Sequence, residues 1–273
     1  MTTTAAQEAF LRAFHAEHPA VTAEAFGGGR GPDGQSSYEI LCQRVAGSRR
    51  VLDLGCGDGL LLEHLARSEG RQLAGVDLSP ESLFLARRRP ALSGARLEEG
   101  RAQSLPFADD SFDACVSHMA LMLMSDVDLV AAEIARVLSP GGVLACVLGG
   151  GAVGGEAYER FVALLRSTVA DVPASRRVPA LGDRRTRSRD GLDAILGPAG
   201  FTAPDWETVP IDLSGSADEV WDVVSRVYDL GPLDRTAVER LREDFLAEVT
   251  ETASPDGRVP CAFKIHVATA RVR

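Results

Sequence analysis

The sequence lacks most features that mark secreted, membrane-bound or disulfide-stabilised proteins. Its five cysteines are scattered over 273 residues and form no CxxC pair, so a disulfide framework is not expected and a reducing cytoplasm is the simpler interpretation. No apolar run approaches the roughly 18 residues that span a bilayer. The first residues also lack the basic start and apolar centre of a signal peptide. We therefore expect a cytoplasmic protein without a membrane partner.

Lysine is almost absent and positive charge is in deficit. Lys264 is the only lysine among 29 basic residues, against 39 acidic residues, which gives a net charge of −10. An acidic chain repels phosphate backbones on average, so nucleic acid is not an expected partner. The use of arginine in place of lysine, together with abundant Ala, Gly and Val, is typical of a GC-rich genome.

From residue 50 the sequence alternates between short apolar runs and amphipathic stretches. This pattern predicts helices near 59–68, 80–89 and 126–138, and strands at Val51–Leu54, Gln72–Val76, Ala95–Glu99, Phe112–Ser117 and Val143–Leu148. Such alternation requires a parallel sheet with right-handed crossovers and helices on both faces. The predicted fold class is therefore a doubly wound α/β domain.

The flanking segments are predicted to be mainly helical. Residues 1–36 indicate one helix followed by a glycine-rich hinge at 27–34, which together could act as a lid over a site. A second helix begins near Ser36, whose spacing from Glu39 is that of a capping box. Beyond Leu148 we expect a loop at 149–156, helices near 157–171, 188–196, 216–229 and 234–252, and strands near 205–213 and 259–272.

The most specific motif is a strand that runs directly into three glycines before a helix, Val51-Leu-Asp-Leu-Gly-Cys-Gly-Asp-Gly59. Glycines allow a sharp turn and a close ligand, and the helix N-terminus offers free N–H groups. Asp77 ends the next strand, where an acid can bind both hydroxyls of a ribose. The carboxylate of Asp53 would repel a pyrophosphate but attract an ammonium group. Leu60 occupies the position where a dinucleotide motif has its third glycine. These details favour a ligand that carries an adenosine and a positively charged amino acid.

At this point the sequence resembles the class I S-adenosylmethionine-dependent methyltransferases, of the type that acts on small molecules. The resemblance rests on four segments in order: DLGCGDG (53–59), GVDLS (75–79), RAQSLPFADDSFDACVSH (101–118) and IARVLSPGG (134–142). It implies a seven-stranded, mostly parallel sheet whose last strand is antiparallel. Together with the flanking segments, the expected organisation is a lid at 1–36, a cofactor-binding core at 37–150 and substrate-covering helices with the remaining strands at 151–273.

The resemblance further implies S-adenosylmethionine as the cofactor and a role for each motif residue. The glycine loop with Gly55, Cys56 and Gly57 would line the methionine part, and Asp53 would help to hold its ammonium group. Asp77 would bind the ribose, Leu78 would pack beside the adenine, and Ala102 and Gln103 would lie at the adenine edge. Ser117 and His118 would border the transferable methyl group. Gln103 departs from the family, which often has an acid there.

Several side chains keep two interpretations at this stage. His118 is a candidate general base, because strand ends on this side of a sheet face the ligand, but it is equally suited to packing as a neutral ring. Tyr38 is a candidate to cap the cofactor or an ordinary packing residue. His15 and His18 could meet the substrate if the first helix is a lid. Further ligands that would make a metal site with them are not evident in the sequence.

The function expected from these observations is transfer of a methyl group from S-adenosylmethionine to an N or O atom of a small molecule, in bacterial secondary metabolism. The extra helices could enclose a small acceptor. The alternatives are a methyltransferase that acts on protein or RNA and a nicotinamide-dependent enzyme. The sequence indicates neither the acceptor nor an oligomeric state.

Overall fold

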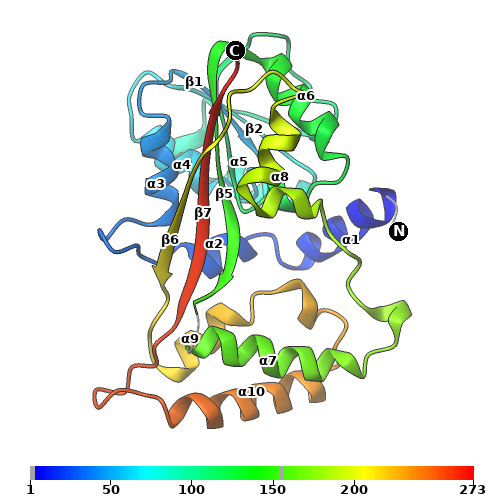
Figure 1. The fold of residues 1–273 in the computed structure, drawn as a ribbon, viewed down its shortest axis with the longest axis vertical. Helices are drawn as coiled ribbons and strands as arrows, with labels where there is room; N and C mark the ends of the chain where they lie inside the picture. Colours follow the sequence, from blue (N-terminus) through cyan, green and yellow to red (C-terminus); the bar gives the residue numbers. More distant parts are fainter. Residues whose placement is uncertain (1–3, 154–155) are drawn as a thin grey trace.

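The structure of the chain, a computed structural model, describes residues 4–153 and 156–273. These residues form a seven-stranded sheet in the order β3-β2-β1-β4-β5-β7-β6 (Figure 1). Strands β1 to β5 pair in parallel, and β7 is antiparallel to both β5 and β6. The strands are β1 (Arg50–Leu54), β2 (Gln72–Asp77), β3 (Arg96–Glu99), β4 (Phe112–His118), β5 (Leu138–Ala152), β6 (Asp205–Asp212) and β7 (Ala262–Arg271). The predicted α/β class and the antiparallel last strand are confirmed.

Helices cover both faces of this sheet. One face carries α3, α4 and α5, and the other carries α6 and α8. Their bounds are α3 (Ser37–Arg44), α4 (Leu60–Ala66), α5 (Pro80–Arg87), α6 (Val127–Val137) and α8 (Arg189–Leu196). The predicted capping box of Ser36 and Glu39 is present at the start of α3. Because β1 lies between β2 and β4, the strand order reverses beside β1, and ligands of open α/β sheets bind at such a point.

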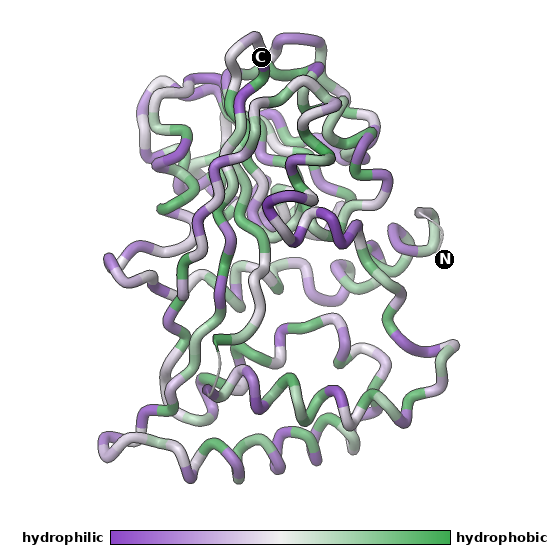
Figure 2. Tube along the Cα trace, viewed as in Figure 1, coloured by the Kyte–Doolittle hydropathy of each residue, from purple (hydrophilic) through white to green (hydrophobic). Residues whose placement is uncertain are grey.

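The central strands are apolar on both faces, as expected for parallel strands covered on both sides. Along β1, Leu52 and Leu54 pack into the core beneath α6 and α8, whereas Val51 packs against α3 and α4. The hydropathy trace shows apolar residues concentrated along the central strands (Figure 2). Alternation along β1 therefore turns Asp53 toward the face that carries α3, because it shares a side with Val51.

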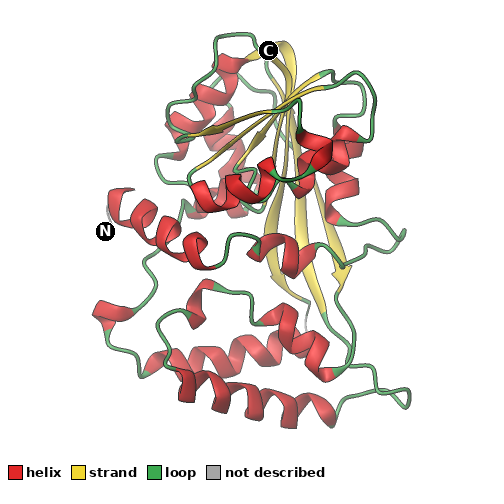
Figure 3. Cartoon of the chain, turned by 180° about the vertical axis from the view of Figure 1, so that it is seen from behind, coloured by secondary structure: helices red, strands yellow, loops and turns green. Residues whose placement is uncertain are grey.

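A second helical layer lies below the sheet, across the ends of β5 and β7 (Figure 1). It consists of α7 (Ala157–Ala170), α9 (Ala217–Val224) and α10 (Arg235–Thr250), which share a separate hydrophobic core around Phe161, Trp221 and Phe245. Between this layer and the sheet run α1 (Thr4–Glu17) and α2 (Val21–Phe26), as the view from behind shows (Figure 3). The N-terminal segment thus separates the two helical layers.

The structure corrects four sequence-based boundaries. Strand β5 begins at Leu138 and not at Val143. The segment predicted as a loop at 149–156 continues β5 to Ala152, because Gly149 and Gly151 pair with β7 across a bulge where Gly151 has a φ of +86°. Residues 154–155 of that segment, and residues 1–3 of the predicted lid, lie outside the described residues. The segment predicted to act as a lid contains two helices rather than one, and the helix predicted at 216–229 ends at Val224.

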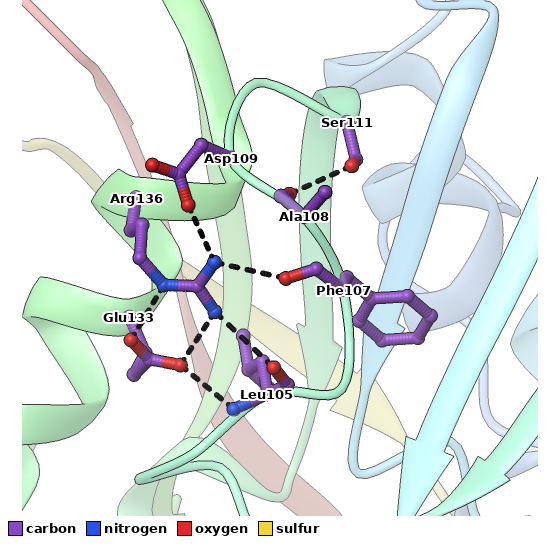
Figure 4. A network of polar contacts seen from close by, with 7 residues as sticks. All are labelled: Leu105, Phe107, Ala108, Asp109, Ser111, Glu133 and Arg136. Atoms are coloured by element: carbon purple, nitrogen blue, oxygen red, sulfur yellow. Dashed lines mark hydrogen bonds and ion pairs between the residues drawn. The ribbon is translucent and has the colours of Figure 1, made fainter.

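The loop that leads into β4 is fixed by one arginine of α6 (Figure 4). Arg136 donates to Glu133 on its own helix at 2.7 Å, to the carbonyl oxygens of Leu105 and Phe107 at 3.2 and 2.8 Å, and to Asp109 at 2.8 Å. Glu133 also accepts the backbone N–H of Leu105 at 2.7 Å. The pair therefore satisfies several backbone groups of a loop that has no strand partner.

Replacing Arg136 by methionine is expected to destabilise the protein by about 2 kcal/mol, because it leaves Glu133 and two carbonyl groups without their donor. Thermal unfolding of the variant measures this loss. The matched control is Arg235→Met, because Arg235 is exposed and, among the described residues, forms an ion pair only with Glu239, four residues along α10, so its loss should be under about 0.5 kcal/mol. Equal destabilisation by the two substitutions would contradict this account of the loop.

Within the described ranges 4–153 and 156–273, every helix is too short or too polar to cross a lipid bilayer. All five cysteines are free thiols.

Candidate functional site

The loop between β1 and α4 turns back onto β2. The backbone N–H groups of Gly55 and Cys56 both donate to the carbonyl oxygen of Val76, at 2.9 and 3.1 Å. Gly57 has a φ of +51°, a conformation that favours glycine, and a Cβ at Gly55 would collide with Ala120. The predicted glycine loop is therefore a site of close backbone approach at the end of the central strand.

Asp77, at the end of β2, is bound to this loop by its side chain. One carboxylate oxygen accepts the N–H of Gly57 at 2.8 Å and the other accepts the N–H of Ser79 at 2.9 Å. Burial raises the pKa of Asp77, and the N–H groups of Ser79 and Gly57 and the nearby His15 oppose that rise. Each oxygen keeps a further lone pair for a ligand. The carboxylate is thus held in a fixed orientation and can still accept two hydroxyl groups.

Asp53 is the most unusual side chain of the site. It is only 1% exposed, and neither carboxylate oxygen accepts a hydrogen bond from the described residues. Burial, together with the carboxylates of Asp77 and Asp58, raises the pKa of Asp53 well above its ordinary value. Because a buried charge without a partner is costly, this group has the character of a binding residue whose partner is a cationic hydrogen-bond donor.

The surroundings of Asp53 strengthen this electrostatic preference. Asp53, Asp58 and Asp77 all line one cavity between the glycine loop and α3, which we call the glycine-loop cavity. Among the described residues, Asp58 is the only one of the three that forms an ion pair with an arginine, Arg89. A positively charged ligand in this cavity would lower the pKa of Asp53 and compensate the clustered carboxylates, so the cavity favours such a ligand.

Tyr38 and His118 form a stacked pair in the same cavity. Their rings lie 3.9 Å apart and nearly parallel, and the Nε2 of His118 is 2.8 Å from the hydroxyl oxygen of Ser37. Burial lowers the pKa of His118 to about 3, so the ring is neutral at physiological pH. Its Nδ1 atom has no hydrogen-bond partner among the described residues.

A second cavity lies beneath α1, and we call it the lid cavity. The carboxyl ends of β2 and β3 and the loops that follow supply Asp77, Leu78, Ala102 and Gln103 to its wall. The side-chain nitrogen of Gln103 donates to the carbonyl oxygen of Ser125 at 2.7 Å. This bond fixes the amide and leaves its oxygen as an acceptor.

Helix α1 covers the lid cavity and is attached at several points. Arg12 donates to the carbonyl oxygen of Leu78 at 2.6 Å and forms an ion pair with Glu99 at 3.0 Å. Arg101 pairs with Glu8 at 2.7 Å. The same helix supplies His15 to the walls of both the lid cavity and the glycine-loop cavity.

A third cavity, of about 410 Å³, adjoins the other two, and we call it the apolar cavity. Most of its lining is aliphatic or aromatic, including Phe14, Phe26, Met122, Tyr158 and Phe263. Its volume lies within the range of about 300–1,000 Å³ that is usual for sites of small organic ligands. It shares with the glycine-loop cavity the residues Val21, Thr22, Met119, Leu123 and Tyr228. The two cavities are therefore neighbours.

The structure brings together most of the residues that the sequence predicts for the site. The glycine-loop cavity is lined by Tyr38, Asp53, Gly55, Cys56, Gly57, Asp77 and His118, and the lid cavity by Leu78, Ala102 and Gln103. Ser117 is placed differently, because its hydroxyl donates to the carbonyl oxygen of Leu54 at 2.8 Å and accepts the N–H of Leu121, fully buried behind the cavities. Sequence reasoning missed Tyr228 and Ser125.

A metal centre has no support in the geometry. In the part of the chain that the structure describes, no group of three or more His, Cys, Asp or Glu side chains is arranged to hold a metal ion. His15 and His18 instead contact aromatic rings, with His18 4.8 Å from the ring of Phe14.

Comparison with known proteins gives consistent relatives. A family model described as a methyltransferase domain matches residues 52–146. A malonyl-[acyl-carrier protein] O-methyltransferase of Halorhodospira halophila is 30% identical over 225 residues, which cover 80% of this chain and 72% of that protein. A fatty-acid O-methyltransferase of Mycolicibacterium smegmatis is 39% identical over 109 residues, but the match spans only 40% of either chain.

Solved structures support the same fold. The YcgJ protein of Bacillus subtilis superposes with a TM-score of 0.56 at 22% sequence identity, covering 87% of this chain and 98% of that one. At this identity the likeness concerns the fold, because unrelated reactions share one scaffold.

Proposed function

Because the chain belongs to the class I S-adenosylmethionine-dependent methyltransferases, we propose that it transfers the methyl group of S-adenosylmethionine to an oxygen or nitrogen atom of a small molecule. The observation that carries this proposal is the buried carboxylate of Asp53 beside the glycine loop, which has no hydrogen-bond partner in the described part of the chain. It has the charge and burial required to bind the ammonium group of the cofactor. The adjoining apolar cavity provides room for an acceptor.

The residues divide the cofactor between two cavities in this proposal. In the glycine-loop cavity Asp53 would hold the ammonium group, with Gly55, Cys56 and Gly57 along the methionine part and Tyr38 closing the site. In the lid cavity Asp77 would bind the ribose hydroxyls. Leu78 and Ala102 would contact the adenine, and the side-chain oxygen of Gln103 would accept a hydrogen bond from the amino group of the adenine. When bound, S-adenosylmethionine supplies a methyl group on a positively charged sulfur, which a nucleophile can displace.

His118 fits a positioning role better than the role of a base. Its pKa of about 3 makes the ring a weak proton acceptor at neutral pH. Its Nε2 atom is engaged with Ser37, and it lines the glycine-loop cavity rather than the apolar cavity. We assign it the task of holding Tyr38 and the end of β4 against the cofactor.

Helix α1 fits the role of a lid in this proposal. Arg12 and Glu8 attach it over the lid cavity, and Phe14 on the same helix lines the apolar cavity. Closure of α1 over the cofactor would therefore also complete the wall against which the acceptor packs, and would exclude water from the reacting atoms.

The acceptor and setting of the reaction extend the proposal. Oxygen is favoured as the methylated atom, because the relatives described above are O-methyltransferases. The apolar cavity favours a hydrophobic molecule over a protein or RNA chain. We further propose that the protein works in the cytoplasm of a bacterium and that its acceptor belongs to secondary metabolism, which is consistent with its free thiols and its GC-rich composition.

The test is a transfer assay with S-adenosylmethionine labelled in its methyl group, incubated with the protein and an extract that contains small molecules, protein and RNA. We expect label in the organic-solvent extract, because the apolar cavity suits a small hydrophobic acceptor. Protein without extract controls for hydrolysis of the cofactor. Label recovered in the protein or RNA fraction alone would contradict the small-molecule assignment.

A further inference from the structure

Tyr228 lies at the boundary between the glycine-loop cavity and the apolar cavity. It belongs to the short 3-10 helix Tyr228–Leu230, which follows α9, and its side chain lines both cavities. Thr22 is the other hydroxyl-bearing residue among the five that the two cavities share. An acceptor in the apolar cavity would therefore present its reacting atom to a wall that contains the Tyr228 hydroxyl.

This hydroxyl is hydrogen-bonded to a histidine of the lid. The Nε2 atom of His15 lies 3.3 Å from the hydroxyl oxygen of Tyr228. The ring of Phe14 packs against Tyr228 at 4.5 Å, and Phe10 lies 6.0 Å away. Two aromatic rings of α1 thus fix the orientation of Tyr228, so that its hydroxyl remains at His15.

The charges around this pair leave His15 able to accept a proton. Burial lowers the pKa of His15, and the carboxylate of Asp77 and a hydrogen bond to the backbone of His18 oppose this. The ring is therefore neutral near pH 7. Burial and Asp77 raise the pKa of Tyr228, so its hydroxyl keeps its proton and can donate one hydrogen bond while it accepts another.

We infer that Tyr228 contacts the reacting hydroxyl of the acceptor and that His15 receives the proton through it, so that the acceptor is an apolar molecule with an un-ionised hydroxyl group. This inference rests on the proposed function. The acceptor's hydroxyl proton passes to the oxygen of Tyr228 while the proton of Tyr228 passes to Nε2 of His15. The acceptor oxygen forms a bond to the methyl carbon as the bond from that carbon to sulfur breaks. A neutral thioether and a protonated His15 remain.

A proton-accepting residue is needed for methyl transfer to a hydroxyl group but not for transfer to a carboxylate. A carboxylic acid has a pKa near 4 and is already a nucleophile at neutral pH, whereas an aliphatic or phenolic hydroxyl must lose its proton during transfer. His118 does not serve this purpose, because it does not line the apolar cavity and because burial lowers its pKa to about 3, which makes the ring a weak proton acceptor at neutral pH. His15 and Tyr228 are the pair that meets the requirement.

The first test measures binding without turnover, in the complex with S-adenosylhomocysteine. The probes are 4-octylphenol and its methyl ether, 4-octylanisole, which lacks the hydroxyl donor. We expect the wild-type complex to bind the phenol about tenfold more tightly than the ether, and Tyr228→Phe to bind the two equally, because one hydrogen bond is lost. The affinity of Tyr228→Phe for S-adenosylhomocysteine should stay within about threefold of wild type.

The second test measures transfer to 4-octylphenol and to dodecanoic acid. We expect Tyr228→Phe and His15→Gln each to lower the rate with the phenol by about a hundredfold, the usual contribution of a general base. His15→Gln should also remove the rise of kcat/KM with pH that a titrating histidine imposes. His18→Gln is the matched control, because His18 follows directly after the end of α1 and lies outside the pair, and it should retain the wild-type rate and pH profile.

Three results would overturn the inference: no binding of 4-octylphenol by the wild-type complex, equal affinities for phenol and ether in wild type, or methylation of dodecanoic acid but not of the phenol. Wild-type rates in both Tyr228→Phe and His15→Gln would do so as well. Failure of the proposed function is distinguishable, because it would appear as loss of S-adenosylhomocysteine binding in the wild-type protein itself.

Discussion

Replacing Asp53 by asparagine is expected to weaken S-adenosylhomocysteine binding at least about a hundredfold, while it stabilises the protein without ligand. The carboxylate is buried and unpartnered among the described residues, so the ammonium group of the ligand would be its only counter-charge. Removing one partner of a buried charge pair costs about 3 kcal/mol or more, which corresponds to at least two orders of magnitude in Kd. Isothermal titration measures this change.

The stabilisation should depend on pH in a defined direction. Burial raises the pKa of Asp53 in the folded protein, so the folded state binds its proton more tightly than the unfolded chain does. The wild-type protein without ligand should therefore lose stability as the pH rises from about 4 through that raised value. Asp53→Asn removes this loss, and we expect it to exceed wild type at pH 8 by about 2 kcal/mol, or roughly 4–8 °C in Tm.

Asp113→Asn is the matched control for this pair of effects. Asp113 lies on β4 and accepts hydrogen bonds from Arg50 at 2.6 and 2.9 Å, and these contacts hold its pKa below the ordinary value. Its replacement should lower stability and leave ligand affinity unchanged. Unchanged affinity in Asp53→Asn would contradict the assigned binding role, and lower stability of that variant at pH 8 would show that the carboxylate has a partner in the ligand-free protein.

Replacing Asp77 by asparagine is expected to weaken binding of the nucleoside part of the ligand by a similar factor. Both oxygens of Asp77 already accept backbone N–H groups of Gly57 and Ser79, so an amide would place its NH₂ group against one of these donors. The two ribose hydroxyls would also lose a charged acceptor, at roughly 1.5–3 kcal/mol each. Titration with 5′-methylthioadenosine, which has the ribose and adenine but no amino acid, measures this part alone.

Two ligands and two variants distinguish the two carboxylates. Asp77→Asn should weaken the binding of both S-adenosylhomocysteine and 5′-methylthioadenosine, whereas Asp53→Asn should weaken the binding of S-adenosylhomocysteine alone. Thermal unfolding in the absence of ligand shows whether Asp77→Asn remains folded. If Asp77→Asn binds 5′-methylthioadenosine as tightly as wild type does, the ribose is not at the end of β2.

The core of the fold could be predicted because its strands are short, apolar and separated by amphipathic helices. Strands β1 to β4 agree with the prediction within one residue at each end. The error at Gly149–Ala152 has a local cause. Glycine is typical of loops, but here a bulge and pairing with β7 keep the backbone extended. That pairing joins segments more than 100 residues apart and leaves no pattern within the segment itself.

The site was predictable where it is local and not where it is assembled from distant elements. Asp53, Gly57 and Asp77 lie at strand ends that the sequence pattern locates. Tyr228 reaches the site only because the lower helical layer folds back beneath α1, over 200 residues from His15 in the chain. The sequence also left two interpretations of His118 open, because the choice between a base and a packed neutral ring depends on its burial beside Tyr38.

The most direct test of the central claim is isothermal titration of the purified protein with S-adenosylmethionine, with NADH and the Asp77→Ala variant measured alongside. We expect saturable binding of S-adenosylmethionine, at least about a hundredfold weaker in Asp77→Ala, and no heat of binding with NADH. Binding of NADH without binding of S-adenosylmethionine would contradict the account and place the glycine loop among dinucleotide sites.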